Sequence, residues 1–137
     1  MKRVAVRTVA WLFFAVVAAA QQRAQLENIK TEWQNAYGAI IYTVLANVKN
    51  VSDAPVGYVK VKVQLFDKDG KLVVERAGYN AEAEILDTEG FGGSFEDKVK
   101  LVKPIAPGGT DLFRLSLDKA DIGKPFRTAK VEVVEVH

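Results

Sequence analysis

The chain of 137 residues contains no cysteine and only one histidine, His137, which is its last residue. The lack of cysteine excludes disulfides, thiolate metal sites, cysteine nucleophiles and the lipid-carrying cysteine of a bacterial lipoprotein. We expect a terminal residue to be frayed, so His137 would not be held in position as a general base. This excludes Ser-His-Asp and Cys-His catalytic sites and His-rich zinc sites. The remaining acids are scattered through turns and outward strand positions. The sequence therefore predicts no enzyme activity, no catalytic residue, no metal site and no cofactor.

An excess of charge of one sign is also lacking. The formal net charge is +2, from 19 Lys and Arg against 17 Asp and Glu. Lys2, Arg3 and Arg7 lie in the first twenty residues, which contain no acid, so residues 21–137 keep 16 basic residues against 17 acidic ones, a charge of about −1. Such a near-neutral chain has no electrostatic footprint for nucleic acid. Its 49% apolar residues are sufficient to form a hydrophobic core without disulfides.

Long hydrophobic runs are missing except for one, at residues 8–20, which read TVAWLFFAVVAAA. This run follows a basic segment and ends in Ala18-Ala19-Ala20, the small-x-small pattern of a signal-peptidase site. A membrane-spanning helix needs roughly 20 apolar residues, so the run is short for a permanent anchor. The sequence predicts a signal peptide over residues 1–20, cleaved after Ala20, with an uncleaved anchor as the alternative. The mature protein is then expected to be periplasmic or secreted, without a membrane span.

From residue 39 onward the apolar residues recur with the period of a β-strand. One face of the first strand carries Ile40, Tyr42, Val44, Ala46 and Val48, and the next strand alternates Val59, Val61, Val63 and Leu65 with polar residues. Further strands are expected over residues 71–76, 98–103, 112–118 and 130–136. Ile29, Thr31 and Trp33 alternate as an edge strand would, although Ile29, Trp33 and Tyr37 also have helical spacing.

These patterns predict an all-β fold, an antiparallel immunoglobulin-like β-sandwich of about seven strands preceded by a signal-peptide helix. The expected organisation is a signal peptide at 1–20, an N-terminal extension or edge strand at 21–38, and one sandwich domain at 39–137.

The stretch VQLFDKDGK, residues 63–71, resembles part of a calcium loop. An EF-hand needs acids at positions one, three and five, Gly at six and Glu at twelve. With Gly70 at position six, Leu65 and Arg76 stand at positions one and twelve, where carboxylates are required. A four-residue hairpin built on a type I turn, with Gly70 at positive φ, explains the stretch instead. A weak surface calcium site of another geometry stays open.

The same region resembles the FxLYD domain family of exported bacterial and archaeal proteins, from about Ile40 to Val136. The resemblance rests on residues 47–52 (NVKNVS), on Val63-x-Leu65-Phe66-Asp67, and on residues 107–109 (PGG) before a strand with Phe113. Val63 and Phe66 depart from the Phe and Tyr of the family motif. The resemblance implies a small exported β-sandwich and supplies no catalytic residue. In this pattern Asn47 and Asn50 are expected to satisfy backbone groups of the turn.

A long segment at residues 78–94 contains Gly90-Phe91-Gly92-Gly93 and is expected to be a flexible connection or a ligand loop. Tyr79 and Phe91 are the aromatic residues expected to be exposed there and to contact a partner or ligand. The sequence thus predicts a non-enzymatic binding module that contacts an unknown protein of the periplasm or cell envelope. The alternative is a carbohydrate-binding module that uses Tyr79 and Phe91 as stacking platforms.

Overall fold

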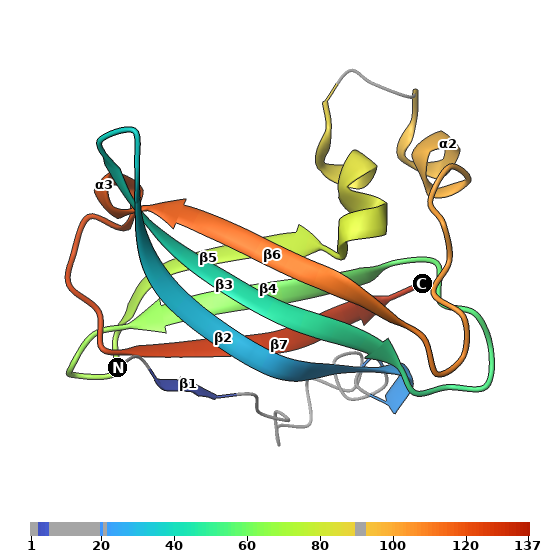
Figure 1. Ribbon diagram of the computed structural model, residues 1–137, viewed down its shortest axis with the longest axis horizontal. Coiled ribbons are helices and arrows are strands. Elements are labelled where there is room, and N and C mark those ends of the chain that lie inside the picture. Colours follow the sequence, from blue (N-terminus) through green and yellow to red (C-terminus); the bar gives the residue numbers. More distant parts are fainter. Residues whose placement is uncertain (1–2, 6–19, 21, 90–92) are drawn as a thin grey trace.

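The computed structural model describes residues 3–5, 20, 22–89 and 93–137, which form a mostly β protein with two antiparallel sheets of three long strands each (Figure 1). One sheet has the order β2-β3-β6, from Ala24–Ala36, Ala39–Asn50 and Thr110–Asp118. The other has the order β7-β4-β5, from Thr128–Val136, Val59–Phe66 and Leu72–Tyr79. A three-residue strand β1 (Arg3–Ala5) joins the second sheet parallel to β7.

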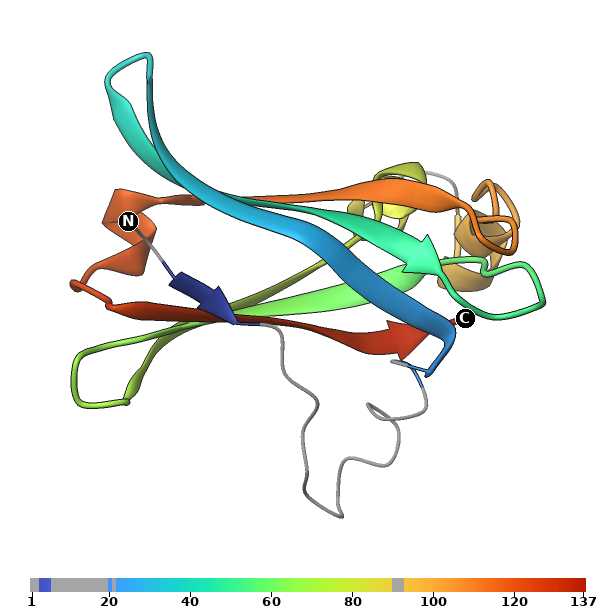
Figure 2. The same ribbon diagram turned by 60° about the horizontal axis from the view of Figure 1, so that its bottom comes forward.

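The two sheets stack face to face and share one hydrophobic core (Figure 2). The buried apolar residues of β3 and β4 belong to the rows that the alternation predicted: Tyr42, Val44, Ala46 and Val48, with Val59, Val61, Val63 and Leu65. Thr43 and Asn50 of β3 are buried as well. Phe113 and Leu117 of β6 and Val131 and Val133 of β7 complete the layer. The inward face predicted for β4 is confirmed, and the row predicted for β3 is buried except at Ile40, which is 42% exposed.

Strand β2 occupies the segment for which both a strand and a short helix were open. It is 13 residues long, pairs only with β3 among the described strands and forms one edge of its sheet. A bulge interrupts the pairing between Glu27 and Lys30, where Asn28 takes φ 53°. Its core-facing side chains include Leu26 and Ile29, which pack against the shared core.

The predicted signal-peptide helix lies largely outside the described residues. Of its segment, the structure describes Arg3–Ala5, which form β1 instead of helix, and Ala20, which is buried against the core. None of the helices in the described part of the chain has the length and apolar character needed to cross a bilayer.

The strand predicted at residues 98–103 is wrong. Helix α2 (Phe95–Val99) ends in this segment and a turn follows it, and Leu101 is 63% exposed. Ser94 and Asp97 form a capping box at the helix start, which satisfies two backbone N–H groups reciprocally. The buried Lys98 donates to the carbonyl of Thr88. Lysines alternate with apolar residues here without forming a strand, because the capping box favours a helix.

The preceding segment, expected to be a loop, contains the 3-10 helix η2 (Ala81–Asp87). Its Ala83 and Leu86 pack with Tyr58 and Val102 in a second, smaller apolar cluster. The buried Asn80 fixes the start of η2, because its Oδ1 accepts from the Val59 N–H and its Nδ2 donates to Asp111. Residues 78–89 are therefore a packed element and not a loose connection.

Asn50 closes the turn after β3, as its place in the sequence predicted. It is fully buried, and its Nδ2 donates to the carbonyl oxygens of Ala54 at 2.8 Å and Ile105 at 2.9 Å. Its Oδ1 accepts from the backbone N–H and the hydroxyl of Ser52. Asn47 instead lies within β3, opposite Glu27 and Leu112, and does not close the turn.

We expect Asn50→Ala to lower the free energy of unfolding by about 2–4 kcal/mol, because the substitution leaves buried backbone groups without partners. Asn47→Ala is the matched control and should cost less than about 1 kcal/mol. Urea denaturation of the two variants measures the difference. Equal losses for both would contradict the assigned role of Asn50.

Candidate functional site

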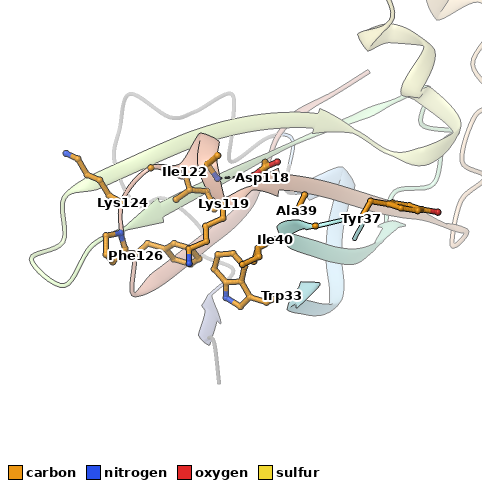
Figure 3. A pocket seen from close by; sticks show the side chains of 13 residues that line it. Trp33, Tyr37, Ala39, Ile40, Asp118, Lys119, Ile122, Lys124 and Phe126 are labelled. Atoms are coloured by element: carbon orange, nitrogen blue, oxygen red, sulfur yellow. Dashed lines mark hydrogen bonds between the residues drawn. The ribbon is translucent and has the colours of Figure 1, made fainter. Parts of the chain in front are cut away.

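A groove of about 1050 Å³ opens at one end of the stacked sheets, beneath the tip of the β2–β3 hairpin (Figure 3). One wall is the hairpin tip, with Trp33, Tyr37 and Ile40, and the opposite wall is helix α3 (Lys119–Ile122) with the segment that follows it to Phe126. The lining is mainly apolar, as ligand and partner sites usually are.

The floor of the groove is formed by Trp33 and Phe126, whose rings pack on the fully buried Tyr42 beneath them. The Trp33 ring centroid lies 5.0 Å from that of Tyr42 and 5.8 Å from that of Phe126, and Tyr42 meets Phe126 edge-on at 4.9 Å. These separations are typical of favourable aromatic pairs. Burial raises the pKa of the Tyr42 hydroxyl, and the Thr31 side chain offsets part of that rise. Trp33 remains 40% exposed and offers part of its indole to the groove.

The hairpin extends beyond the strand next to it, which is why apolar side chains are exposed here. Strand β3 pairs with β2 back to Ala39, whereas its pairing with β6 begins only at Ile41 opposite Asp118. Ile40 continues the inward row of Tyr42 past the end of β6. Tyr42 is fully buried, whereas Ile40 is 42% exposed.

A two-residue turn, Tyr37-Gly38, closes the hairpin. Both residues have positive φ, 51° and 84°, as a type I′ turn requires, and Ala36 pairs directly with Ala39. Asn-Gly is the usual sequence in such turns, and a tyrosine at positive φ is uncommon. The Tyr37 side chain is fully exposed at the tip and points away from the aromatic floor (Figure 3). An exposed aromatic residue thus stands at a strained backbone position.

The wall opposite the hairpin carries charges of both signs. Asp118 caps α3, because its Oδ1 accepts from the Ala120 N–H at 2.9 Å, and Gly123 ends the helix at φ 74°. Lys119 and Lys124 line the groove and are exposed. One oxygen of Asp118 is therefore engaged in the helix cap, and the exposed Asp121 of α3 adds a second carboxylate to the wall that holds Lys119 and Lys124.

Of the two residues predicted from sequence to contact a ligand, Tyr79 lies at the other end of the sheets. Tyr79 is half-buried, meets Tyr58 edge-on at 5.4 Å and has the Lys60 ammonium 5.7 Å from its ring centroid. Phe91 lies outside the described residues. The structure does not bring Tyr79 near the groove, and a contact role for Tyr79 or Phe91 stays a prediction.

The C-terminal residue is fixed and not frayed, contrary to expectation. The His137 N–H donates to the Tyr58 carbonyl at 3.0 Å, and the Gly57 N–H donates to the His137 carbonyl at 2.8 Å. The imidazole stacks on the Tyr58 ring with a centroid separation of 5.1 Å. Tyr58 in turn donates to Glu135, and its pKa is raised well above the usual range, first by burial and then by that carboxylate.

The Asp67–Lys71 turn has the geometry expected of the hairpin. Gly70 has φ 80°, and its N–H donates to the Asp67 carbonyl at 3.1 Å. The Asp67 side chain accepts from the N–H groups of Asp69 and Lys71. Its carboxylate therefore stabilises the turn. Among the described residues, no group of three or more histidine or acidic side chains is placed to hold a metal ion.

Hydrogen bonds from the turn, first that of the Lys71 N–H, hold the pKa of the Asp67 carboxyl below its ordinary value. Because this folded-state pKa is depressed, the carboxylate contributes stability above the unfolded pKa of ~3.9, and the contribution is lost as pH falls through the folded value. Carboxyl NMR should place the Asp67 pKa below ~3.9. The stability deficit of Asp67→Ala relative to wild type should be larger at neutral than at strongly acidic pH. A pKa at or above ~3.9 would contradict the assignment.

Sequence reasoning missed the groove residues as a set. Trp33 and Phe126 come from distant parts of the chain, and Phe126 follows a short helix that was not predicted. A local signal was present, because residues 33–41 (WQNAYGAII) contain no charged side chain although they include an edge strand. Edge strands are usually protected by charge, so an uncharged tip indicates a contact surface.

Comparison of the chain with protein-family models, with curated proteins and with solved structures gave no match in any of the three.

Proposed function

We propose that this protein is an exported, non-enzymatic binding module of the periplasm or cell envelope that holds a partner protein in the groove between the β2–β3 hairpin tip and α3. The observation that carries the proposal is the partly exposed aromatic floor, bordered by the exposed Tyr37 and Ile40. Aromatic residues in a concave apolar site are the usual anchors of protein contacts.

The proposal includes an immunoglobulin-like sandwich of the FxLYD kind. The sheet orders β2-β3-β6 and β5-β4-β7 correspond to the A-B-E and C′-C-F orders of immunoglobulin folds. The NVKNVS and VQLFD stretches support the family assignment, and Asn50 and Asp67 of these stretches serve structural roles at turns. Such residues maintain the scaffold, so the binding function falls to the groove.

Export is supported by the basic start, the apolar run and the Ala-rich end of residues 1–20. A non-enzymatic role is supported by the arrangement of ionisable groups. His137 stacks on Tyr58 at the end of the molecule opposite α3, and Asp118 at the groove is engaged in a helix cap (Figure 1). The groove is thus equipped for apolar contact more than for proton transfer.

A carbohydrate ligand is the second candidate, favoured by the exposed indole of Trp33. Sugars are held by several polar side chains in addition to a stacking ring. Asp118 is the one acid of the lining and has one oxygen engaged in a helix cap, and Trp33, Ile40 and Phe126 supply apolar surface. This chemistry favours a peptide segment over a sugar.

Capture of partners from a native envelope extract, with chemical crosslinking, tests the proposed function. Tyr37→Asn removes the exposed ring and installs the Asn-Gly pair preferred in type I′ turns, so folding should be unaffected. Trp33→Ser removes the partly exposed indole from the floor of the groove. Both variants should lose at least about tenfold of the captured partner, as loss of an aromatic anchor usually costs.

Leu101→Ser is the matched control, because Leu101 is exposed in the segment after α2, away from the groove. It should capture as much partner as the wild type. Capture that is equal in all four proteins, or no partner above background, would refute the proposed function. Binding of the wild type to a glycan array, lost in Trp33→Ser, would establish the carbohydrate candidate instead.

A further inference from the structure

We infer that the outer edge of β7 accepts an extended segment of a partner protein, with apolar residues at alternate positions and a hydroxyl or amide side chain opposite Glu132, and that β1 occupies this edge until residues 1–20 are removed. Arg3–Ala5 of β1 pair parallel with residues 128–130, on the side of β7 away from β4 (Figure 2). In the proposed immunoglobulin-like assignment this is the place of strand G beside strand F. The inference concerns a surface other than the groove and rests on the proposed removal of the signal peptide.

Removal of β1 turns β7 into an edge strand. Among the described strands only β1 lies on this side of β7, and it covers 3 of the 9 residues of β7. The backbone N–H and C=O groups that point away from a sheet edge are a template for a further strand. The pairing with β1 shows that this edge accepts a strand in the parallel direction. An extended segment of another protein would make the same backbone hydrogen bonds along a longer stretch of β7.

The apolar requirement follows from the inner side of this edge. Ala129, Val131 and Val133 of β7 are buried in the shared core. Strand β1 contacts β2 of the facing sheet as well as β7, so a strand at this position lies at the rim between the two sheets. Leu26 and Ile29 of β2 pack against the same core and remain partly exposed. Side chains at every second position of the bound segment point into this rim, where apolar residues continue the core.

The hydroxyl or amide requirement follows from Glu132, which points to the outer face of the sheet together with Lys62, its partner on β4. The ammonium groups of Lys62 and Lys130 lie 3.7 and 4.0 Å from Oε1 of Glu132. Its Oε2 has no hydrogen-bond partner in the described part of the chain, although the side chain is only 3% exposed. Such an enclosed oxygen normally accepts a hydrogen bond. Two lysines already balance the carboxylate, so the bound segment needs a neutral donor at this position and not a third ammonium group.

Peptide binding to the processed chain tests the inference. This chain is isolated from the envelope fraction, and its intact mass should correspond to a start at Gln21. The probe is the fluorescein-labelled peptide Ser-Val-Ser-Val-Thr-Val-Ser, whose threonine falls opposite Glu132 in the register of β1. Fluorescence anisotropy should show saturable binding, and the peptide with valine in place of threonine should bind about three- to tenfold more weakly. The variant Ala18→Phe, which blocks the predicted cleavage site and keeps β1, should bind the probe at least about tenfold more weakly.

N-methylated peptides distinguish strand addition from contact through side chains alone. Alternate N–H groups of a strand point to the same side, so methylation of the valines and methylation of the other residues block opposite edges of the peptide. Only one of the two methylated peptides should lose binding.

Glu132→Val should abolish the advantage of threonine over valine in the peptide, because it removes the acceptor. Glu75→Val is the matched control, since Glu75 lies on β5 at the other edge of the same sheet, opposite Gln64, and it should keep the advantage. The methylated peptides are tested on the wild type, so their result stands even where Glu132→Val does not fold.

Retention of residues 1–20 in the envelope fraction, equal affinity of the threonine and valine peptides, or loss of binding in both or neither of the methylated peptides would overturn the inference. Self-association of the processed chain that the peptide displaces would overturn it in favour of a second copy of the chain. Partner capture that depends on Trp33 and Tyr37, without any binding of the peptide, would refute the inference and leave the groove as the site of the proposed function.

Discussion

The alternation of side chains along the β2–β3 hairpin is the constraint on which the rest of the structure depends. In a strand every second side chain points to the same face, so the inward row of β3 cannot stop where the core stops. Pairing between β3 and β6 ends at Ile41 and Asp118, while pairing with β2 continues to Ala39. The inward row therefore runs from the buried Tyr42 to the partly exposed Ile40. The groove is the end of the core left open by this difference in length.

Local chemistry at the end of β6 determines what faces the exposed row. Asp118 caps α3, and the left-handed Gly123 ends the helix after a single turn. The chain then returns along the groove, where Phe126 packs against Trp33 and Tyr42, before β7 begins at Thr128. The cap engages one oxygen of Asp118, and Lys119, Asp121 and Lys124 are exposed around it. Charge and shape at the groove thus arise from the same short helix.

The parts of the fold that could be predicted from sequence are those set by local periodicity and turn chemistry. The rows of β3 and β4 and the turn at Gly70 follow from patterns within a few residues. A strand was wrongly predicted at residues 98–103 because lysines alternate with apolar residues there. The Ser94–Asp97 capping box, which is also present in the sequence, starts a helix instead.

The groove itself could not be predicted from local patterns. Trp33 and Phe126 meet only through the stacking of two sheets, and the exposure of Ile40 depends on where a neighbouring strand ends. The place of Tyr37 in the hairpin turn was not predicted for a different reason: tyrosine rarely occupies a turn position with positive φ. The sequence drew attention instead to Tyr79 and Phe91. Tyr79 ends β5 at the opposite end of the sheets from α3 (Figure 1), and Phe91 lies outside the described residues.

Partner binding at the hairpin–α3 end and partner binding at the η2–α2 end are therefore competing hypotheses. In-cell photocrosslinking distinguishes them directly. A photoreactive phenylalanine derivative would replace Tyr37 at the hairpin tip in one variant and Leu101 beside α2 in another, both of them exposed positions. We predict a specific covalent adduct in the envelope fraction from position 37 and none from position 101. An adduct formed from position 101 alone would contradict binding at the hairpin tip and would place the binding surface at the η2–α2 end.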